Sequence, residues 1–208
     1  MNSILKSVIF MFITALVFSS LVTAVKIANQ DRIEINQKIK LQRTILTVLG
    51  LDKDAQLTPE QVTDIYNNRI KEDKIGDRTI YTSYSKDGKT VAGYAFPVDG
   101  PGFWGPVYAM AAVDANVTKL IGVSFYKHSE TPGLGGRISE KWFSDQFKNL
   151  SLEDDGNDKK YFYLTPEGDN KKDNDLDAVT GASRTSDAVE TFLNRELQVV
   201  AKELRDRK

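Results

Sequence analysis

The C-terminal end of the chain carries the clearest periodic pattern of hydrophobic positions. Apolar residues recur there at spacings of three and four, which places them on one face of a helix: Val189, Phe192, Leu193, Leu197, Val200 and Leu204. The pattern predicts a helix from about Ser186 to the C-terminus. Ser186 is placed to cap the amino end of this helix, and Asp187 puts a negative charge near the positive end of the helix dipole.

A long apolar run lies near the other end of the chain. Residues 7–25 carry no charge and are bracketed by Lys6 and Lys26; as a helix they span about 28 Å, enough to cross a bilayer. We therefore predict a transmembrane anchor. A secretory signal peptide is the alternative, because the small residues at 22–24 resemble a cleavage site. More lysine and arginine follows the run than precedes it, which by itself favours a domain on the cytoplasmic side.

Two further helices are predicted before the middle of the chain. The first covers residues 31–50, with apolar positions on one face and Gly50 as its C-terminal stop. The second begins at Thr58, where a proline at the first helical position and Gln61 suit a capping box. Its buried stripe is predicted to consist of Val62, Ile65, Tyr66 and Ile70. These helices are assigned a scaffolding role.

The periodicity changes to that of strands after Asp77. Runs of β-branched and aromatic residues predict strands at 79–84, 90–96, 107–113, 120–126 and 161–164, and a short amphipathic helix follows the fourth of them, at 138–147. The expected fold class is α+β, a twisted antiparallel sheet with packed helices, preceded by one N-terminal transmembrane helix. We divide the chain into an anchor at 1–27, a helical stalk with the first helices at 28–76, and one domain at 77–208.

Composition excludes several classes of function. The 208 residues are 40% hydrophobic and 27% charged, enough for one core. A net charge of -1 argues against binding nucleic acid, and the lack of cysteine excludes disulfides, iron–sulfur ligation and thiol chemistry in this chain. The acidic residues from Asp173 to Asp177 do not form an EF-hand, because Ala178 and Arg184 occupy positions that need glycine and a carboxylate. We expect a solvated acidic surface and no metal site.

Hydroxyl side chains gather just before the C-terminal helix. Thr180, Ser183 and Thr185 flank Gly181, an arrangement that suits a phosphate held at a helix N-terminus. From spacing alone, a connection that binds nothing is the simpler interpretation. The segment lacks the second glycine of a nucleophile elbow, and the chain contains no P-loop motif. His128, the single histidine, is interpreted as a structural residue, and no catalytic residue is predicted.

Two motifs in this chain resemble a known family. Residues 177–183 (DAVTGAS) resemble the flavinylation motif of the FMN-binding domain shared by the C subunit of Na+-translocating NADH:quinone reductase (Nqr) and the G subunit of the Rnf complex. Residues 126–136 (YKHSETPGLGG) resemble the E-T-P-G-L-G loop of the same family. The resemblance extends to the N-terminal anchor and to residues 102–108 (GFWGPVY), so it covers most of the chain and implies that residues 77–208 form an FMN-binding domain.

The resemblance also implies the site and its cofactor. In this family a flavin transferase joins FMN through its phosphate to a hydroxyl side chain. By position the acceptor is Ser183, where the family usually has threonine, and Thr185 is the second candidate. Residues expected to shape the phosphate turn are Thr180, Gly181 and Ala182. Residues expected to hold the flavin ring are Glu130, Thr131, Gly133, Leu134, Gly135 and, by stacking, Trp104.

The function implied by the resemblance is a membrane-anchored electron-transfer subunit of a Rnf- or Nqr-type complex that translocates Na+ or H+. Its partners would be the other subunits, without turnover by this chain alone. The family places the flavin domain on the extracytoplasmic side of the cytoplasmic (inner) membrane, against the charge count above. The length of the chain resembles that of the Rnf subunit, whereas residues 45–51 and 102–104 resemble the quinone reductase subunit. An independent extracytoplasmic FMN reductase and a flavin-free membrane-tethered binding or assembly module are the alternatives.

Overall fold

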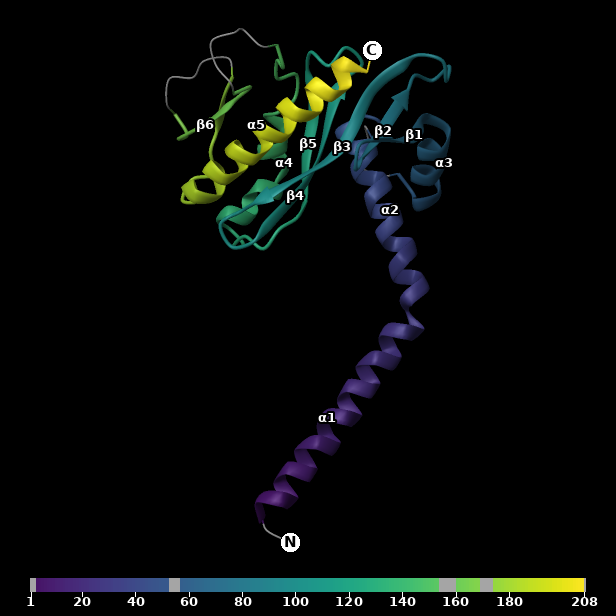
Figure 1. The fold of residues 1–208 in the computed structure, drawn as a ribbon, viewed down its shortest axis with the longest axis vertical. Coiled ribbons are helices and arrows are strands. Elements are labelled where there is room, and N and C mark those ends of the chain that lie inside the picture. Colours follow the sequence, from purple (N-terminus) through teal and green to yellow (C-terminus); the bar gives the residue numbers. More distant parts are fainter. Residues whose placement is uncertain (1–2, 53–56, 154–159, 169–173, 208) are drawn as a thin grey trace. The chain divides into compact units, whose positions relative to one another are not determined.

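A computed structural model describes residues 3–52, 57–153, 160–168 and 174–207, which form two compact units, 1–41 and 42–208 (Figure 1). Much of the two acidic segments, residues 154–158 and 169–173, lies outside the described residues. The predicted antiparallel α+β fold with one N-terminal apolar helix is confirmed.

The first unit contains a single long apolar helix, α1 (Ser3–Ala28). None of its residues is buried, and it is long and apolar enough to cross a membrane. The hydroxyls of Ser7 and Thr14 donate to the carbonyls of Ser3 and Phe10, one turn earlier. These bonds satisfy the hydroxyls inside the helix, as a lipid environment requires. The next helix, α2 (Gln30–Val48), begins in this unit and ends in the second.

The second unit starts with two helical segments that bury apolar residues. The end of α2 buries Ile45, Leu46 and Val48. Helix α3 (Pro59–Arg69) has the predicted capping box. The Gln61 backbone N–H donates to the Thr58 hydroxyl oxygen, and the Thr58 backbone N–H donates to the side-chain oxygen of Gln61. One prediction is wrong here: Ile70 does not belong to the stripe of α3 but begins a strand, β1 (Ile70–Ile75).

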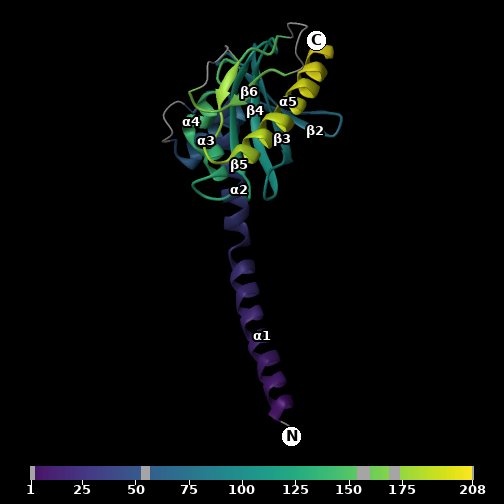
Figure 2. The same cartoon turned by 90° about the vertical axis from the view of Figure 1, so that its left-hand side faces the viewer.

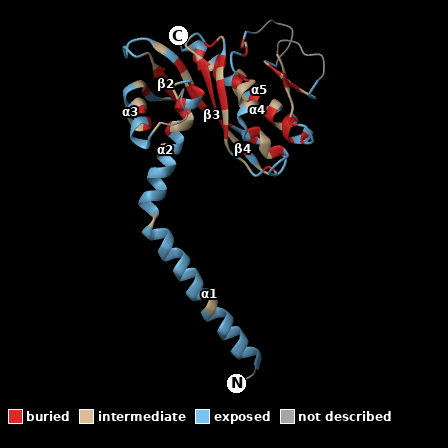
Figure 3. Cartoon of the chain, turned by 180° about the vertical axis from the view of Figure 1, so that it is seen from behind, coloured by how far each residue is buried: buried red, intermediate tan, exposed pale blue. Residues whose placement is uncertain are grey.

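Strand β1 was not predicted from the sequence, because it is an edge strand with four charged residues in its sequence, IKEDKI. It pairs with β2 (Arg78–Tyr84), and the remaining strands follow as β3 (Val91–Pro101), β4 (Pro106–Asp114) and β5 (Leu120–Lys127). All neighbours are antiparallel, in the order β1-β2-β3-β4-β5. Figure 3 shows buried residues concentrated along these strands and along the helices that pack on them.

The hairpin of β3 and β4 is longer than predicted and extends to residues 102–105. Its register continues to the pair Pro101↔Pro106. The Gly102 N–H then donates to the Gly105 carbonyl at 2.8 Å and closes the tip. Phe103 and Trp104 therefore stand at the end of the hairpin.

The last helix, α5 (Ser183–Asp206), lies across one face of the sheet against β3 (Figures 1 and 2). Close approach depends on Gly100, since a Cβ there would lie 2.3 Å from the Phe192 Cβ. The predicted start at Ser186 is wrong: the helix begins three residues earlier with Ala182 as its cap residue. Ser186 instead accepts a hydrogen bond from the Val179 N–H, which fastens the preceding loop to the helix.

Short elements complete the unit. A 3₁₀ helix, η1 (Gly135–Ser139), and α4 (Lys141–Asp145) take the place of the single amphipathic helix predicted at 138–147. Strand β6 (Tyr163–Thr165) pairs in parallel with β7 (Asp175–Asp177), a strand that the acidic sequence did not predict. Leu176 is its one buried residue.

Candidate functional site

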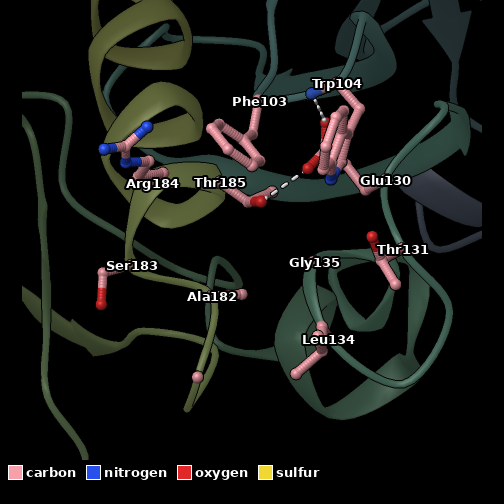
Figure 4. Close-up of a pocket in the computed structure, with 11 residues that line it drawn as sticks. Phe103, Trp104, Glu130, Thr131, Leu134, Gly135, Ala182, Ser183, Arg184 and Thr185 are labelled. Carbon is pink, nitrogen blue, oxygen red and sulfur yellow. Dashed lines mark hydrogen bonds between the residues drawn. The ribbon is translucent and has the colours of Figure 1, made fainter.

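A cavity of about 300 Å³ opens where three segments of the second unit meet (Figure 4). The segments are the tip of the β3–β4 hairpin, the loop from β5 to η1, and the start of α5 with the turn before it. The lining residues are Phe103, Trp104, Glu130, Thr131, Leu134, Gly135, Gly181, Ala182, Ser183, Arg184 and Thr185. In Figure 4, Phe103 and Trp104 enter from one side and Leu134 lies on the other.

The structure brings most of the predicted site residues to this cavity, although they come from distant parts of the sequence. Two of them do not line it. Thr180 is exposed and donates to the Glu167 carboxylate at 3.3 Å. Gly133 forms the bend of its loop with a φ of 75°, a conformation that favours glycine. Phe103 and Arg184 do line the cavity and were not predicted.

The carboxylate of Glu130 joins the three segments. One oxygen, Oε2, accepts the Thr185 hydroxyl at 2.6 Å, and the other, Oε1, accepts the backbone N–H of Trp104 at 3.0 Å. Glu130 is only 4% exposed and Thr185 only 3%. Hydrogen bonds to a buried carboxylate are stronger than those between neutral groups. Glu130 therefore fixes the hairpin tip and the start of α5 relative to its own loop.

Two glycines make this arrangement possible. A Cβ on Gly135 would lie 2.5 Å from the Thr185 Oγ1 and 2.8 Å from the Glu130 Oε2. A Cβ on Gly102 would lie 2.6 Å from the Glu130 Oε1. Real Cβ atoms do not approach oxygen so closely, so these positions need glycine for space.

The turn before α5 is closed by a backbone hydrogen bond of its own. Gly181 has a φ of 79°, and the Ala182 N–H closes the turn on the Val179 carbonyl at 2.9 Å. Ala182 has no side-chain oxygen with which to cap the helix. The first N–H groups of α5 therefore have no side-chain cap, and the positive end of the helix dipole favours an anion there.

The two candidate hydroxyls of this helix differ in their surroundings. Ser183 is the first residue of α5 and is exposed, whereas Thr185 is buried and donates to Glu130. Figure 4 shows the Thr185 hydroxyl directed toward Glu130 and that of Ser183 directed away from this pair. Of the two, Ser183 has the accessible oxygen.

Aromatic rings form the apolar side of the site. The rings of Phe103 and Trp104 meet edge to face with centroids 4.9 Å apart, and Trp104 is 65% exposed. Trp142, the other tryptophan of the chain, does not line the cavity; its indole N–H donates to Glu140. The site thus combines an exposed flat ring with an anion-favouring helix end, which suits a ligand with a planar body and an anionic tail.

His128 lies outside the cavity and supports its loop. Its Nδ1 accepts the Glu130 backbone N–H at 3.2 Å, and its Nε2 lies 2.7 Å from the Ser139 Oγ. This pattern is that of a neutral ring that carries its proton on Nε2.

Comparisons with known proteins agree with a site for a ligand that has a planar body and an anionic tail. The FMN-binding domain family model matches residues 102–198, which include all the cavity segments. A relative from Clostridium ljungdahlii, the G subunit of a proton-translocating ferredoxin:NAD(+) oxidoreductase complex, is 31% identical over 70% of this chain and 72% of its own length. The C subunit of the Na(+)-translocating NADH-quinone reductase from Vibrio campbellii is 24% identical over 85% of this chain and 84% of its own length.

A solved structure also resembles this one. The crystal structure of the C subunit of Na(+)-translocating NADH-quinone reductase from Parabacteroides distasonis superposes with a TM-score of 0.70 at 24% identity. The match covers 84% of this chain and 96% of the other. This likeness supports the fold.

Proposed function

The chain belongs to the family of FMN-binding subunits that includes the C subunit of NADH-quinone reductases and the G subunit of ferredoxin:NAD(+) oxidoreductases, and from this we propose that it carries FMN as an electron-transfer subunit of such an ion-translocating complex. When bound, FMN accepts and donates electrons, while the protein tethers and orients it. The carrying observation is the cavity itself, which unites Ser183, the Glu130 loop and the aromatic hairpin tip.

The cavity residues fit an FMN. The cavity volume of about 300 Å³ lies at the lower end of the range for small-molecule sites, roughly 300–1,000 Å³. The exposed ring of Trp104 and the side chain of Leu134 offer flat and apolar contacts for the flavin ring, on opposite sides of the cavity (Figure 4). The uncapped first turn of α5 offers N–H donors to the phosphate.

Ser183 is the proposed point of covalent attachment. A phosphoester requires an oxygen that a flavin transferase can reach, and Ser183 is exposed, whereas the Thr185 hydroxyl is buried and bonded to Glu130. The bond formed is Ser183 Oγ to phosphorus. The bond broken is the pyrophosphate linkage of an activated flavin nucleotide, and the hydroxyl proton leaves as the nucleotide departs. The net gain is one FMN less one water.

Membrane anchoring places this cofactor in a fixed location. Helix α1 serves as the anchor, and the other subunits of the complex are the proposed electron donors and acceptors. We further propose that the flavin-bearing unit lies on the extracytoplasmic side, where a covalent bond prevents loss of a scarce cofactor. This proposal follows the family rather than the distribution of lysine and arginine around α1.

The test is the intact mass of the full-length protein after co-expression with a flavin transferase. The wild type and Ser183→Thr, which restores the hydroxyl usual in the family, should gain one FMN less water. Ser183→Ala should gain nothing. Thr180→Ala serves as the matched control because its hydroxyl lies in the same loop but does not line the cavity.

Thr185→Val separates the two acceptors, with circular dichroism to establish that the variant is folded. A folded Thr185→Val that keeps its FMN supports Ser183. Loss of FMN from folded Thr185→Val together with retention in Ser183→Ala would move the bond to Thr185. An unmodified wild type would refute the covalent flavin, and co-purification with multi-span membrane subunits would then distinguish an assembly module from an independent protein.

A further inference from the structure

Arg184 is the one positively charged residue among those that line the cavity. Its guanidinium carbon lies 5.2 Å from the centre of the Phe103 ring, within cation–π distance. Figure 4 draws the Arg184 side chain on the Phe103 side of the helix start and the adjacent Ser183 hydroxyl pointing the opposite way. The charge is therefore held toward the aromatic end of the cavity and away from the proposed phosphate linkage.

No acidic side chain balances this charge within the described part of the chain. Among the described residues, Arg184 takes part in no ion pair, and the cavity's carboxylate, Glu130, uses both oxygens to bind Trp104 and Thr185. The first turn of α5 contains no acidic residue either. Among the described residues, the charge of Arg184 thus has no ionic partner beside the ligand site.

Local electrostatics disfavour an arginine at this position. Arg184 is the second residue of α5, where the helix dipole is positive and where a cation is destabilising. Departures from such local rules are expected at functional or strained sites. A negatively charged group supplied by a ligand would reverse the penalty.

On the basis of the proposed function, we propose that Arg184 sets the reduction potential of the flavin. The guanidinium that Phe103 holds at the aromatic end of the cavity would attract the negative charge of a reduced isoalloxazine bound there. This attraction would stabilise the reduced flavin and raise its potential. The phosphodiester needs the arginine less, because the first turn of α5 has no side-chain cap and would supply N–H donors to it.

The experiment compares full-length flavinylated wild type with Arg184→Gln and Arg184→Lys in detergent. Arg195→Gln is the matched control, since Arg195 lies on the same helix, is exposed and is remote from the cavity lining. Intact mass is measured first, and the flavin potential is then measured by dithionite titration against a reference dye. We expect a shift to a more negative potential in Arg184→Gln, a smaller shift in Arg184→Lys, and none in Arg195→Gln. The shift should shrink at high salt.

The mass step separates the two proposals. A wild type without FMN refutes the proposed function before any potential is measured. Equal potentials in flavinylated wild type and Arg184→Gln would overturn the role of Arg184. That role is also overturned if Arg195→Gln shifts the potential equally, or if Arg184→Gln loses FMN while its residual flavin keeps the wild-type potential, because the arginine would then act on the phosphate.

Discussion

The Thr185 hydroxyl donates to the Glu130 carboxylate at 2.6 Å across 55 positions of sequence. This bond joins the loop after β5 to the first turn of α5, and both segments lie within the residues that match the FMN-binding domain family. It also commits the Thr185 oxygen to a structural task. The neighbouring Ser183 is exposed and keeps the accessible hydroxyl.

Removal of the Thr185 hydroxyl should destabilise the protein. In Thr185→Val the shape is retained but Glu130 Oε2 loses its buried donor, so we expect the free energy of unfolding to fall by roughly 1–3 kcal/mol. Thr185→Ser should restore most of it. Urea unfolding of the full-length protein in detergent, followed by tryptophan fluorescence, measures the effect. Ser183→Ala, at an exposed position, should stay within about 0.5 kcal/mol, and a Thr185→Val as stable as the wild type would contradict the bond's importance.

The glycine beside this bond should not tolerate a methyl group. A Cβ in Gly135→Ala would lie 2.5 Å from Thr185 Oγ1, so the bond must lengthen or the loop must move. We expect a loss of roughly 1–3 kcal/mol in unfolding free energy and a lower yield of flavinylated protein by mass. Gly105→Ala is the control, because its nearest neighbour, the Ser129 Cβ, is at 3.4 Å. Equal behaviour of the two variants would argue against a tight cradle.

The loss of folding stability at low pH should depend on Asp114, at the end of β4. Burial disfavours its carboxylate, but hydrogen bonds from the backbone N–H groups of Lys119, Thr118 and Asn116 and from the Thr118 hydroxyl outweigh this and hold the pKa of Asp114 below its usual value. A lowered pKa in the folded state contributes stability that is fully present above about pH 4, the unfolded value, and is lost as the pH falls through the folded value.

Asp114→Asn should therefore lower stability near neutral pH by about 1–2 kcal/mol and flatten the decline below about pH 4. Urea unfolding over this pH range, with Asp77→Asn as an exposed aspartate control, measures both changes. A variant that keeps the wild-type acid dependence would show that other carboxylates carry it.

The periodic parts of the fold could be predicted from sequence, and the exceptions have physical causes. The stripe from Val189 to Leu204 predicted α5 because that face packs on the sheet. Strand β1 was missed because edge strands expose charged residues, which hides the period of two. Asn194 was also missed: it is buried on α5 because its amide bonds to the backbone of Tyr161 and Phe162, a tertiary contact that no local pattern encodes.

The site was predictable only in part. The two motifs identified most of its lining through resemblance, while spacing alone favoured a connection that binds nothing. Contact between Glu130 and Thr185 depends on how β5 and α5 are placed in three dimensions. Phe103 and Arg184 were missed because a hairpin tip and a helix start carry no periodic signal that marks a shared cavity.

Replacement of the exposed Trp104 indole should raise the fluorescence yield of the flavin without changing the fold. Trp104 holds Glu130 through its backbone N–H, so Trp104→Ala keeps that bond and should alter stability by less than about 1 kcal/mol. A stacked indole quenches flavin emission by electron transfer. We therefore expect a higher fluorescence yield from native flavinylated Trp104→Ala, normalised to the same sample after denaturation. Trp142→Phe, at the other tryptophan, should leave the yield unchanged because Trp142 lies outside the cavity. An unchanged yield in Trp104→Ala would place the flavin ring away from the hairpin tip.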